Sequence, residues 1–349
     1  MNYYNKIIQK DIALIYQSEL DWSIFNNKTI LITGATGMLA AYLSFFLLFL
    51  RKEKNINLKL IALCRTKSKA EMAFKDYLDK PYFKLLLQDV CDPIQYDGNI
   101  DYIFHFAGNA SPHFINIDPV GIVKSNMLGT FNILELAKEK KTLKVIFAST
   151  REVYGKNEEE ESLKETSFGI IDPMENRSCY PESKRAAETI FRSYFLQYGV
   201  NFNALRIAHS YGPGMNLHSD GRVMADLIGN VVDGKDIELK STGEALRAFC
   251  YITDAVTGIF FAALKGEPGE AYNLANETEE ISIRNLAQML VSLRTDKELK
   301  VIFNIPETNM GYCNYKRVGL NTNKIEELGW KPNVGLKEGC QRTIDSFIG

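Results

Sequence analysis

The stretch from Lys28 to Ala40 (Lys-Thr-Ile-Leu-Ile-Thr-Gly-Ala-Thr-Gly-Met-Leu-Ala) most constrains how this chain can fold. Its apolar, β-branched start predicts a buried parallel strand, and an apolar helix is expected to begin near Met38. In such a strand–turn–helix unit, backbone N–H groups and the helix N-terminus face the same point, which suits a pyrophosphate. A turn of this kind also occurs without a ligand, so whether this one binds a cofactor has to be judged from the rest of the chain. The candidate cofactor contacts in this turn are Gly34, Thr36, Gly37, Met38 and Leu39.

Strand and helix patterns alternate as far as residue 150. Further strands are expected at 58–65, 82–90, 101–108 and 143–150, with a helix over 126–140. This alternation predicts an α/β fold with a doubly wound parallel sheet. Ligands bind such sheets at the carboxyl ends of the strands. Ala107 and Gly108 end one of these strands, and their small size suits the close passage of a dinucleotide cofactor.

The second strand lacks the terminal carboxylate that binds the adenosine ribose in NAD-selective folds. Here Arg65 and Lys67 follow Cys64, and their charge favours the 2′-phosphate of NADP. A solvated basic loop beside an NAD molecule held by backbone contacts explains the same residues, so NAD and NADP stay equal candidates. At the end of the third strand, Asp89 can hold the adenine amino group, with Val90 beside it.

Charge and cysteine content exclude several classes of function. With 349 residues, 46% of them hydrophobic, and a net charge of −2, the chain has no electrostatic case for binding nucleic acid or an anionic membrane. The longest apolar run, from Met38 to Leu50, is too short to cross a bilayer. The six cysteines are scattered and the four histidines lack ligand spacing. We therefore expect reduced thiols, a cytoplasmic protein and no metal.

Tyr180 and Lys184 carry the chemistry that the sequence suggests. Their i and i+4 spacing in Tyr-Pro-Glu-Ser-Lys places both side chains on one face of a helix expected to run to about Gln197. A phenol is a poor base at neutral pH, but a nearby ammonium and a nicotinamide cation lower its pKa. Such a pair also arises by chance, but following a nucleotide-binding turn it indicates catalysis. Lys184 can also hold the nicotinamide ribose.

The run from Ser149 to Gly155 ends a strand that faces the same cleft. Thr150 can hydrogen-bond a substrate hydroxyl and shorten the proton path to Tyr180. Glu152 is a candidate general base if burial raises its pKa. Alternatively, Glu152 is a structural carboxylate that pairs with Arg151.

Together these motifs resemble the extended short-chain dehydrogenase/reductases, the sugar-nucleotide epimerase/dehydratase family, and within it UDP-glucuronate decarboxylases. The resemblance covers about residues 28–345. The segments that carry it are 105–112, 126–132, 149–155, 180–184, 211–213, 220–223 and 246–254.

The resemblance implies a Rossmann-like dinucleotide-binding domain over 28–200 and a smaller C-terminal substrate-binding lobe over 201–349, which partly returns to the first domain. Residues 1–27 are expected to form a helical extension. Asn126 would join the cofactor site. The implied ligands are a nicotinamide cofactor and a nucleotide sugar, with UDP or another nucleoside diphosphate. The implied assembly is a homodimer that pairs through two helices per subunit, and the implied role is in polysaccharide biosynthesis.

The resemblance also implies a shared first step, in which Tyr180 removes the proton of the sugar C4 hydroxyl while hydride leaves C4. Decarboxylases of the family carry Thr-Ser-Glu at the strand end and 4,6-dehydratases Thr-Asp-Glu, whereas this chain has Thr-Arg-Glu. Because arginine is not a proton-donating acid here, dehydration loses support. Arg247 matches the family arginine that binds diphosphate. His209 stands where asparagine is common, and Gly214 where decarboxylases often have arginine. The implied substrate contacts are Thr150, Arg151, His209 and Arg247.

Two reactions thus remain: epimerisation and decarboxylation. A net 4-dehydrogenase or 4-keto reductase is the nearest competitor, because NADP usually serves net reduction and the basic turn after the second strand favours NADP. A non-catalytic nucleotide-binding protein is a remote alternative, which predicts a lost Tyr/Lys pair.

Overall fold

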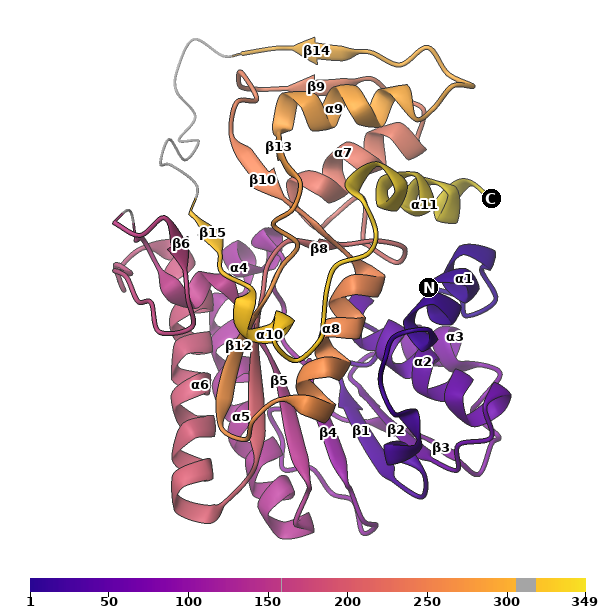
Figure 1. The fold of residues 1–349 in the computed structure, drawn as a ribbon, viewed down its shortest axis with the longest axis vertical. Coiled ribbons are helices and arrows are strands. Elements are labelled where there is room, and N and C mark those ends of the chain that lie inside the picture. The colour runs from indigo at the N-terminus through magenta and orange to yellow at the C-terminus, as the bar shows by residue number, and fades with distance from the viewer. Residues whose placement is uncertain (158, 306–317) are drawn as a thin grey trace.

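The computed structural model describes residues 1–157, 159–305 and 318–349. A seven-stranded sheet forms the lower half of the molecule in Figure 1, and a smaller lobe lies above the carboxyl ends of its strands. The strand order is β12-β7-β5-β4-β1-β2-β3, and every neighbouring pair is parallel. The predicted doubly wound α/β sheet is therefore confirmed. Its strands are β1 (Thr29–Thr33), β2 (Lys59–Cys64), β3 (Phe83–Leu87), β4 (Tyr102–His105), β5 (Lys144–Thr150), β7 (Phe202–Ile207) and β12 (Glu270–Leu274).

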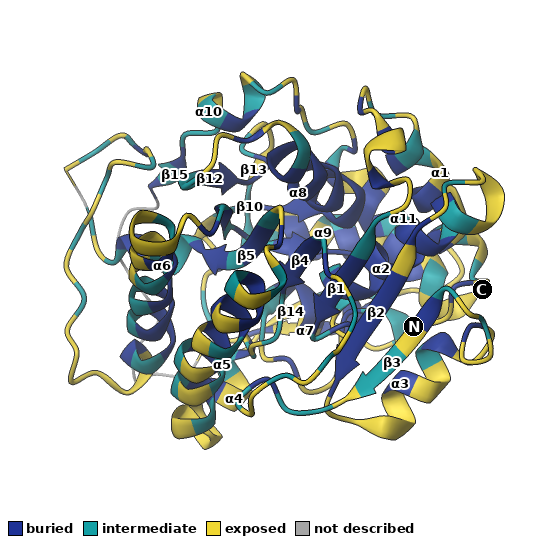
Figure 2. Ribbon diagram, turned by 90° about the horizontal axis from the view of Figure 1, so that it is seen from below, coloured by how far each residue is buried: buried dark blue, intermediate teal, exposed yellow. Residues whose placement is uncertain are grey.

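Helices cover both faces of this sheet. Along β1, Leu31 packs with α5 and α6 on one face, whereas Ile30 and Ile32 pack with α2 and α8 on the other. Seen from below in Figure 2, the strands are largely buried, while the outer sides of α5 and α6 are exposed. The helices around the sheet are α2 (Met38–Glu53), α3 (Lys67–Phe74), α4 (Pro112–Ile117), α5 (Pro119–Lys140), α6 (Cys179–Tyr198), α8 (Ile252–Lys265) and α10 (Asn323–Glu326).

Three boundaries differ by more than one residue from the sequence expectation. The fourth strand ends at His105, so Ala107 and Gly108 lie in the loop beyond it rather than in the strand. The third strand ends at Leu87, so Asp89 and Val90 lie in the loop beyond it. The helix expected from residue 126 begins earlier, at Pro119. The reason is local: the Asp118 carboxylate accepts the N–H of Gly121, and a proline at the first helical position has no N–H to satisfy.

The smaller lobe is built from short strands and two helices after residue 209, with β6 and β15 pairing beside the sheet. Its Ser282 caps α9, because the Ser282 hydroxyl oxygen accepts the N–H of Asn285. The elements are β6 (Ser162–Leu163), β8 (Ser210–Tyr211), α7 (Val223–Val232), β9 (Ile237–Leu239), β10 (Leu246–Ala248), β11 (Cys250–Tyr251), β13 (Glu280–Ser282), α9 (Ile283–Ser292), β14 (Val301–Phe303) and β15 (Gly319–Leu320).

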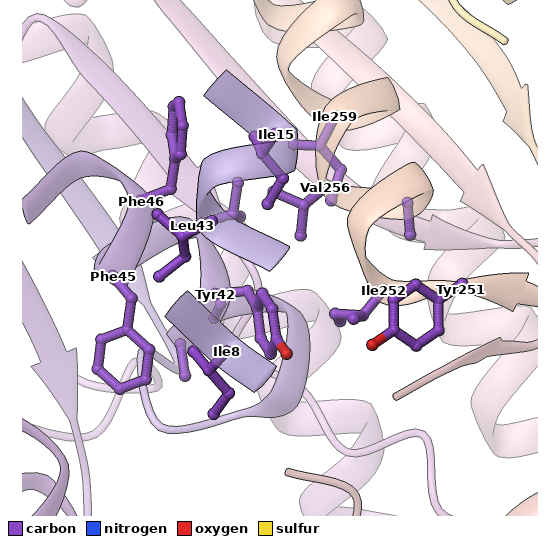
Figure 3. Packing of buried hydrophobic residues seen from close by; sticks show 14 of the residues in the cluster. Ile8, Ile15, Tyr42, Leu43, Phe45, Phe46, Tyr251, Ile252, Val256 and Ile259 are labelled. Atoms are coloured by element: carbon purple, nitrogen blue, oxygen red, sulfur yellow. The ribbon is translucent and has the colours of Figure 1, made fainter. Parts of the chain in front are cut away.

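The N-terminal extension joins the two parts. Its helix α1 (Lys6–Tyr16) packs on α2, on α8 and on the C-terminal helix α11 (Leu336–Ile348). Figure 3 shows Ile8 and Ile15 of α1 against α2 and α8, and it shows the hydroxyls of Tyr42 and Tyr251 directed toward each other. Between these hydroxyls lies Asp11, a fully buried carboxylate that accepts hydrogen bonds from Tyr42 (2.9 Å), Tyr251 (2.8 Å) and Arg342 (3.0 Å). The extension thus ties the sheet domain to the lobe.

In the described ranges, no helix is both long enough and apolar enough to span a bilayer, and no cluster of metal-ligating side chains occurs. The five cysteines within these ranges are free thiols; Cys313 lies outside the described residues.

Candidate active site

The turn after β1 packs directly against the end of β4. Gly34 has a φ of +64°, and a Cβ there would lie 2.9 Å from the backbone of Ala107 and from the carbonyl of Phe106. Only glycine allows both this conformation and this approach. The N–H of Gly37 donates to the carbonyl of Gly34 (2.8 Å), and α2 begins at Met38. The predicted turn and helix N-terminus are therefore formed as expected.

Thr33 and His105 hold the ends of β1 and β4 together. The Thr33 hydroxyl oxygen accepts the N–H groups of Phe106 (3.1 Å) and Ala107 (3.0 Å) and lies 2.9 Å from Nδ1 of His105. Burial, assisted by the charge of Lys184, lowers the pKa of His105 to about 3, so its imidazole is neutral. This residue is therefore a structural link rather than an acid or a base.

A cradle that fits a cofactor lies between Asn126, Gly108 and Lys184. The Asn126 Nδ2 donates to Ser183 (2.9 Å), whereas its buried Oδ1 has no hydrogen-bond partner within the described part of the chain. A Cβ on Gly108 would come within 2.9 Å of that oxygen and 3.6 Å of the Lys184 ammonium. A buried acceptor of this kind calls for a donor. The ribose hydroxyls and carboxamide of a nicotinamide dinucleotide supply such donors, so these residues fit the group.

At the adenosine end, Arg65 pairs with Asp89. The Arg65 guanidinium lies 3.5 Å from a carboxylate oxygen of Asp89, whose other oxygen accepts the N–H of Cys91 (2.9 Å). Val90 beside it is buried, and its carbonyl accepts from Asn132 (2.9 Å). Arg65, the cation that favours NADP, is thus already paired with Asp89, the carboxylate predicted to hold adenine.

Tyr180 and Lys184 lie on one face of α6, as predicted, and both are almost fully buried. The Lys184 Nζ donates to the carbonyl of Ala148 (2.7 Å) and lies over the Phe147 ring. Burial lowers the pKa of Lys184 to about 7, although the charge of Glu188 opposes this shift. Burial also raises the pKa of Tyr180, as does the charge of Glu152, while Thr150, Arg222 and Arg177 lower it.

The structure brings Thr150 and Glu152 to the same place. Thr150 ends β5, and its hydroxyl accepts the N–H of Glu152 (3.2 Å) in the short turn η2 (Arg151–Tyr154). The expected alternative partner of Glu152 is wrong: the carboxylate binds Arg177, not Arg151. The reason is the direction of the Arg151 side chain, which donates to the carbonyl of Val318 (3.1 Å).

His209 and Arg247, the other predicted substrate contacts, lie beyond the sheet. His209 has a φ of +46° and packs on Phe249. Histidine is among the few non-glycine residues enriched in this left-handed region, as asparagine is. Arg247 lies on β10 and donates to the carbonyl of its neighbour Leu246 (2.7 Å). Their roles toward a substrate, like that of Arg151, stay predictions.

Sequence patterns did not single out Arg177 or Ser183. Arg177 belongs to a short turn before α6, η3 (Asn176–Ser178), and no periodicity marks it. Ser183 offered a signal, because it lies between Tyr180 and Lys184 in the motif; its hydroxyl accepts from Asn126.

Known proteins are similar to this chain over most of its length. Residues 30–275 match the family model described as "NAD dependent epimerase/dehydratase family". The chain is 32% identical to UDP-glucuronic acid decarboxylase 6 of Arabidopsis thaliana, over 92% of this chain and 89% of that protein. It is 30% identical to UDP-glucuronic acid decarboxylase 1 of Xenopus tropicalis, over 99% of this chain and 77% of that one.

Solved structures share the fold. A UDP-glucose 4-epimerase of Thermotoga maritima, solved with UDP-glucose, superposes with a TM-score of 0.77 at 24% identity, over 91% of this chain and 98% of that one. The dTDP-glucose 4,6-dehydratase DesIV of Streptomyces venezuelae, solved with NAD, gives 0.74 at 23% identity, over 91% and 96%.

Proposed function

Because the chain belongs to the NAD dependent epimerase/dehydratase family, we propose that this nucleotide-sugar-modifying enzyme oxidises its substrate at C4 and decarboxylates UDP-glucuronate. The observation that carries the proposal is the grouping of Tyr180, Lys184, Thr150 and Glu152 around the carboxyl end of β5. The similarity to proteins named UDP-glucuronic acid decarboxylases over most of the chain supports the choice of reaction.

Each residue has a distinct task in this proposal. The Tyr180 phenolate takes the proton of the C4 hydroxyl, and Thr150 orients that hydroxyl. The Lys184 ammonium donates one hydrogen bond to the carbonyl of Ala148. Its two other N–H groups can donate to the cofactor ribose and to the phenolate. The nicotinamide, when bound, supplies the hydride acceptor and returns the hydride at the end of the cycle.

Decarboxylation then follows from the chemistry of the substrate. A ketone at C4 makes the C6 carboxylate that of a β-keto acid. The C5–C6 bond breaks, carbon dioxide leaves, and the electron pair remains as an enolate across C4 and C5. The enolate then gains a proton at C5, and Glu152, which is partly exposed at the rim of the same site, is the proposed group that relays this proton from solvent.

The test is incubation of the purified protein with UDP-glucuronate and NAD. We expect carbon dioxide and a UDP-pentose in equal amounts, without net formation of reduced nicotinamide. A UDP-hexuronate epimer as product would select epimerisation instead, and stoichiometric consumption of NAD(P) would select the net-redox alternative.

The nicotinamide cofactor is either NAD or NADP, and Arg65 is the residue that we propose distinguishes them. Replacing Arg65 by Ala should weaken NADP binding about tenfold, because a phosphate loses one charge-assisted contact. NAD binding should change less than about twofold, since Asp89 keeps its contact with Cys91. Titration calorimetry with both cofactors measures the difference, with Lys69→Ala on α3 as a surface-charge control. Equal losses for NAD and NADP would contradict the assignment.

We further propose a homodimer through α5 and α6. Their exposed sides carry apolar residues that a monomer would leave in water, and such patches mark interfaces. Phe131→Glu should convert a dimer to a monomer in light scattering, whereas Met72→Glu on α3 should not. A wild-type monomer would contradict the proposal. The exposed apolar residues are Val120, Leu128, Phe131, Leu196 and Tyr198.

We also propose a cytoplasmic location, which the free thiols of the described cysteines support. Fractionation of cells that express the protein measures it.

A further inference from the structure

The charges of two arginines, Arg177 and Arg222, act on the Tyr180 phenol, and each arginine is bound by a carboxylate. The Nη2 atom of Arg177 lies 3.1 Å and 3.0 Å from the two oxygens of Glu152. Arg222, before α7, binds Asp220 through Nε and Nη2. Both arginines act on Tyr180 electrostatically. The charges that act on the tyrosine therefore belong to two ion pairs rather than to isolated side chains.

The Arg177–Glu152 pair is accessible from solvent. The side chain of Arg177 is 47% exposed and that of Glu152 is 40% exposed. Glu152 is held from the other side as well, because its N–H donates to Thr150. An exposed pair of this kind adds little to stability. Stability therefore does not explain why the pair is located close to the buried Tyr180.

The charges around Tyr180 explain the location of the Arg177–Glu152 pair. Burial disfavours the phenolate, and the Glu152 carboxylate disfavours it further. A guanidinium that contacts both Glu152 oxygens offsets this negative charge. The remaining charged neighbours are Arg222 with Asp220, from the segment before α7, and Lys184 with Glu188, from α6 itself; His105 behind Lys184 is neutral.

We propose that Arg177 is a positioning residue, which holds Glu152 at the rim and offsets its negative charge beside Tyr180. The inference rests on the proposed C4 oxidation, in which Tyr180 accepts a proton. It explains how one site contains both a carboxylate for proton transfer at C5 and a phenol that must ionise nearby. Without Arg177, these two demands conflict, since like charges close together disfavour each other.

The test uses the first half-reaction of the full-length enzyme, in which C4 oxidation is followed by the absorbance of reduced nicotinamide in a single turnover with UDP-glucuronate. Arg177→Gln should move the acidic midpoint of the pH–rate profile upward by about one pH unit. The variant should then be about tenfold slower below the midpoint and near the wild-type rate above it. In Arg177→Lys, which keeps the positive charge, the midpoint should lie close to the wild-type value. Arg185→Gln, which breaks the Arg185–Glu182 pair on α6, is the matched control and should leave the midpoint unchanged.

A double variant separates electrostatics from structure. In Glu152→Gln/Arg177→Gln the carboxylate that Arg177 offsets is gone, so the midpoint should return toward the wild-type value. An unchanged midpoint in Arg177→Gln would overturn the inference, and so would a loss of rate that is equal at every pH. If none of the nucleotide sugars tested leads the wild-type enzyme to form reduced nicotinamide, the proposed function is wrong, and the inference that rests on it is wrong as well.

Discussion

Replacing Tyr180 by Phe should lower turnover by at least about a thousandfold, because general base catalysis at the C4 hydroxyl is lost. The ring itself remains, and it packs with Ile115 and Ile122 in a small apolar cluster. Binding of the cofactor and of the nucleotide sugar should therefore stay within about twofold of the wild-type constants. Steady-state rates and calorimetric titrations of the same preparation measure both effects.

Tyr198→Phe is the control for the Tyr180 variant. Tyr198 lies at the other end of α6, where its ring is half exposed. The Tyr198→Phe substitution removes a hydroxyl from the same helix but leaves the site unchanged, so turnover should not change. If Tyr180→Phe kept turnover within tenfold of wild type, the phenol would not be the base.

The largest loss of stability is expected for Asp11→Ala. Three donors, the hydroxyls of Tyr42 and Tyr251 and the guanidinium of Arg342, lose their common acceptor. Burial raises the pKa of Asp11, so ionisation at this site is costly, yet removing one partner of a buried network leaves the others unsatisfied. We expect a decrease of about 3 kcal/mol in the free energy of unfolding, measured by chemical denaturation.

The control for Asp11 is Glu338→Gln. Glu338 also binds Arg342, but on the exposed surface of α11, so the loss should be below about 0.5 kcal/mol. Because α1 contacts α2, α8 and α11, the Asp11 variant should also increase hydrogen exchange in α11. Unfolding free energies equal for the two variants would show that the network does not join the N-terminal helix to the lobe.

Much of the fold could be predicted because local pattern and tertiary packing agree. The strand before Gly34, the helix after it and the helix that carries Tyr180 are formed as the sequence indicates. The helix expected over residues 126–140 is part of α5, which ends at Lys140 as predicted but begins earlier.

The remaining features depend on contacts between distant residues. No local pattern reveals that Arg65 pairs with Asp89, because the two lie at the ends of neighbouring strands β2 and β3. The same holds for Arg177 and Glu152, which two short turns bring together. Asp11 lies in the predicted helical extension, and only the approach of Tyr42, Tyr251 and Arg342 makes it a buried junction.

The proposed reaction depends above all on hydride leaving C4 of the sugar with the help of Tyr180. The most direct measurement is a single-turnover comparison of unlabelled UDP-glucuronate with the same compound carrying deuterium at C4, followed by the absorbance of reduced nicotinamide. We expect a transient of reduced nicotinamide that rises more slowly with deuterium and then decays as product forms. No transient, or one that rises at the same rate with both compounds, would contradict the proposed reaction.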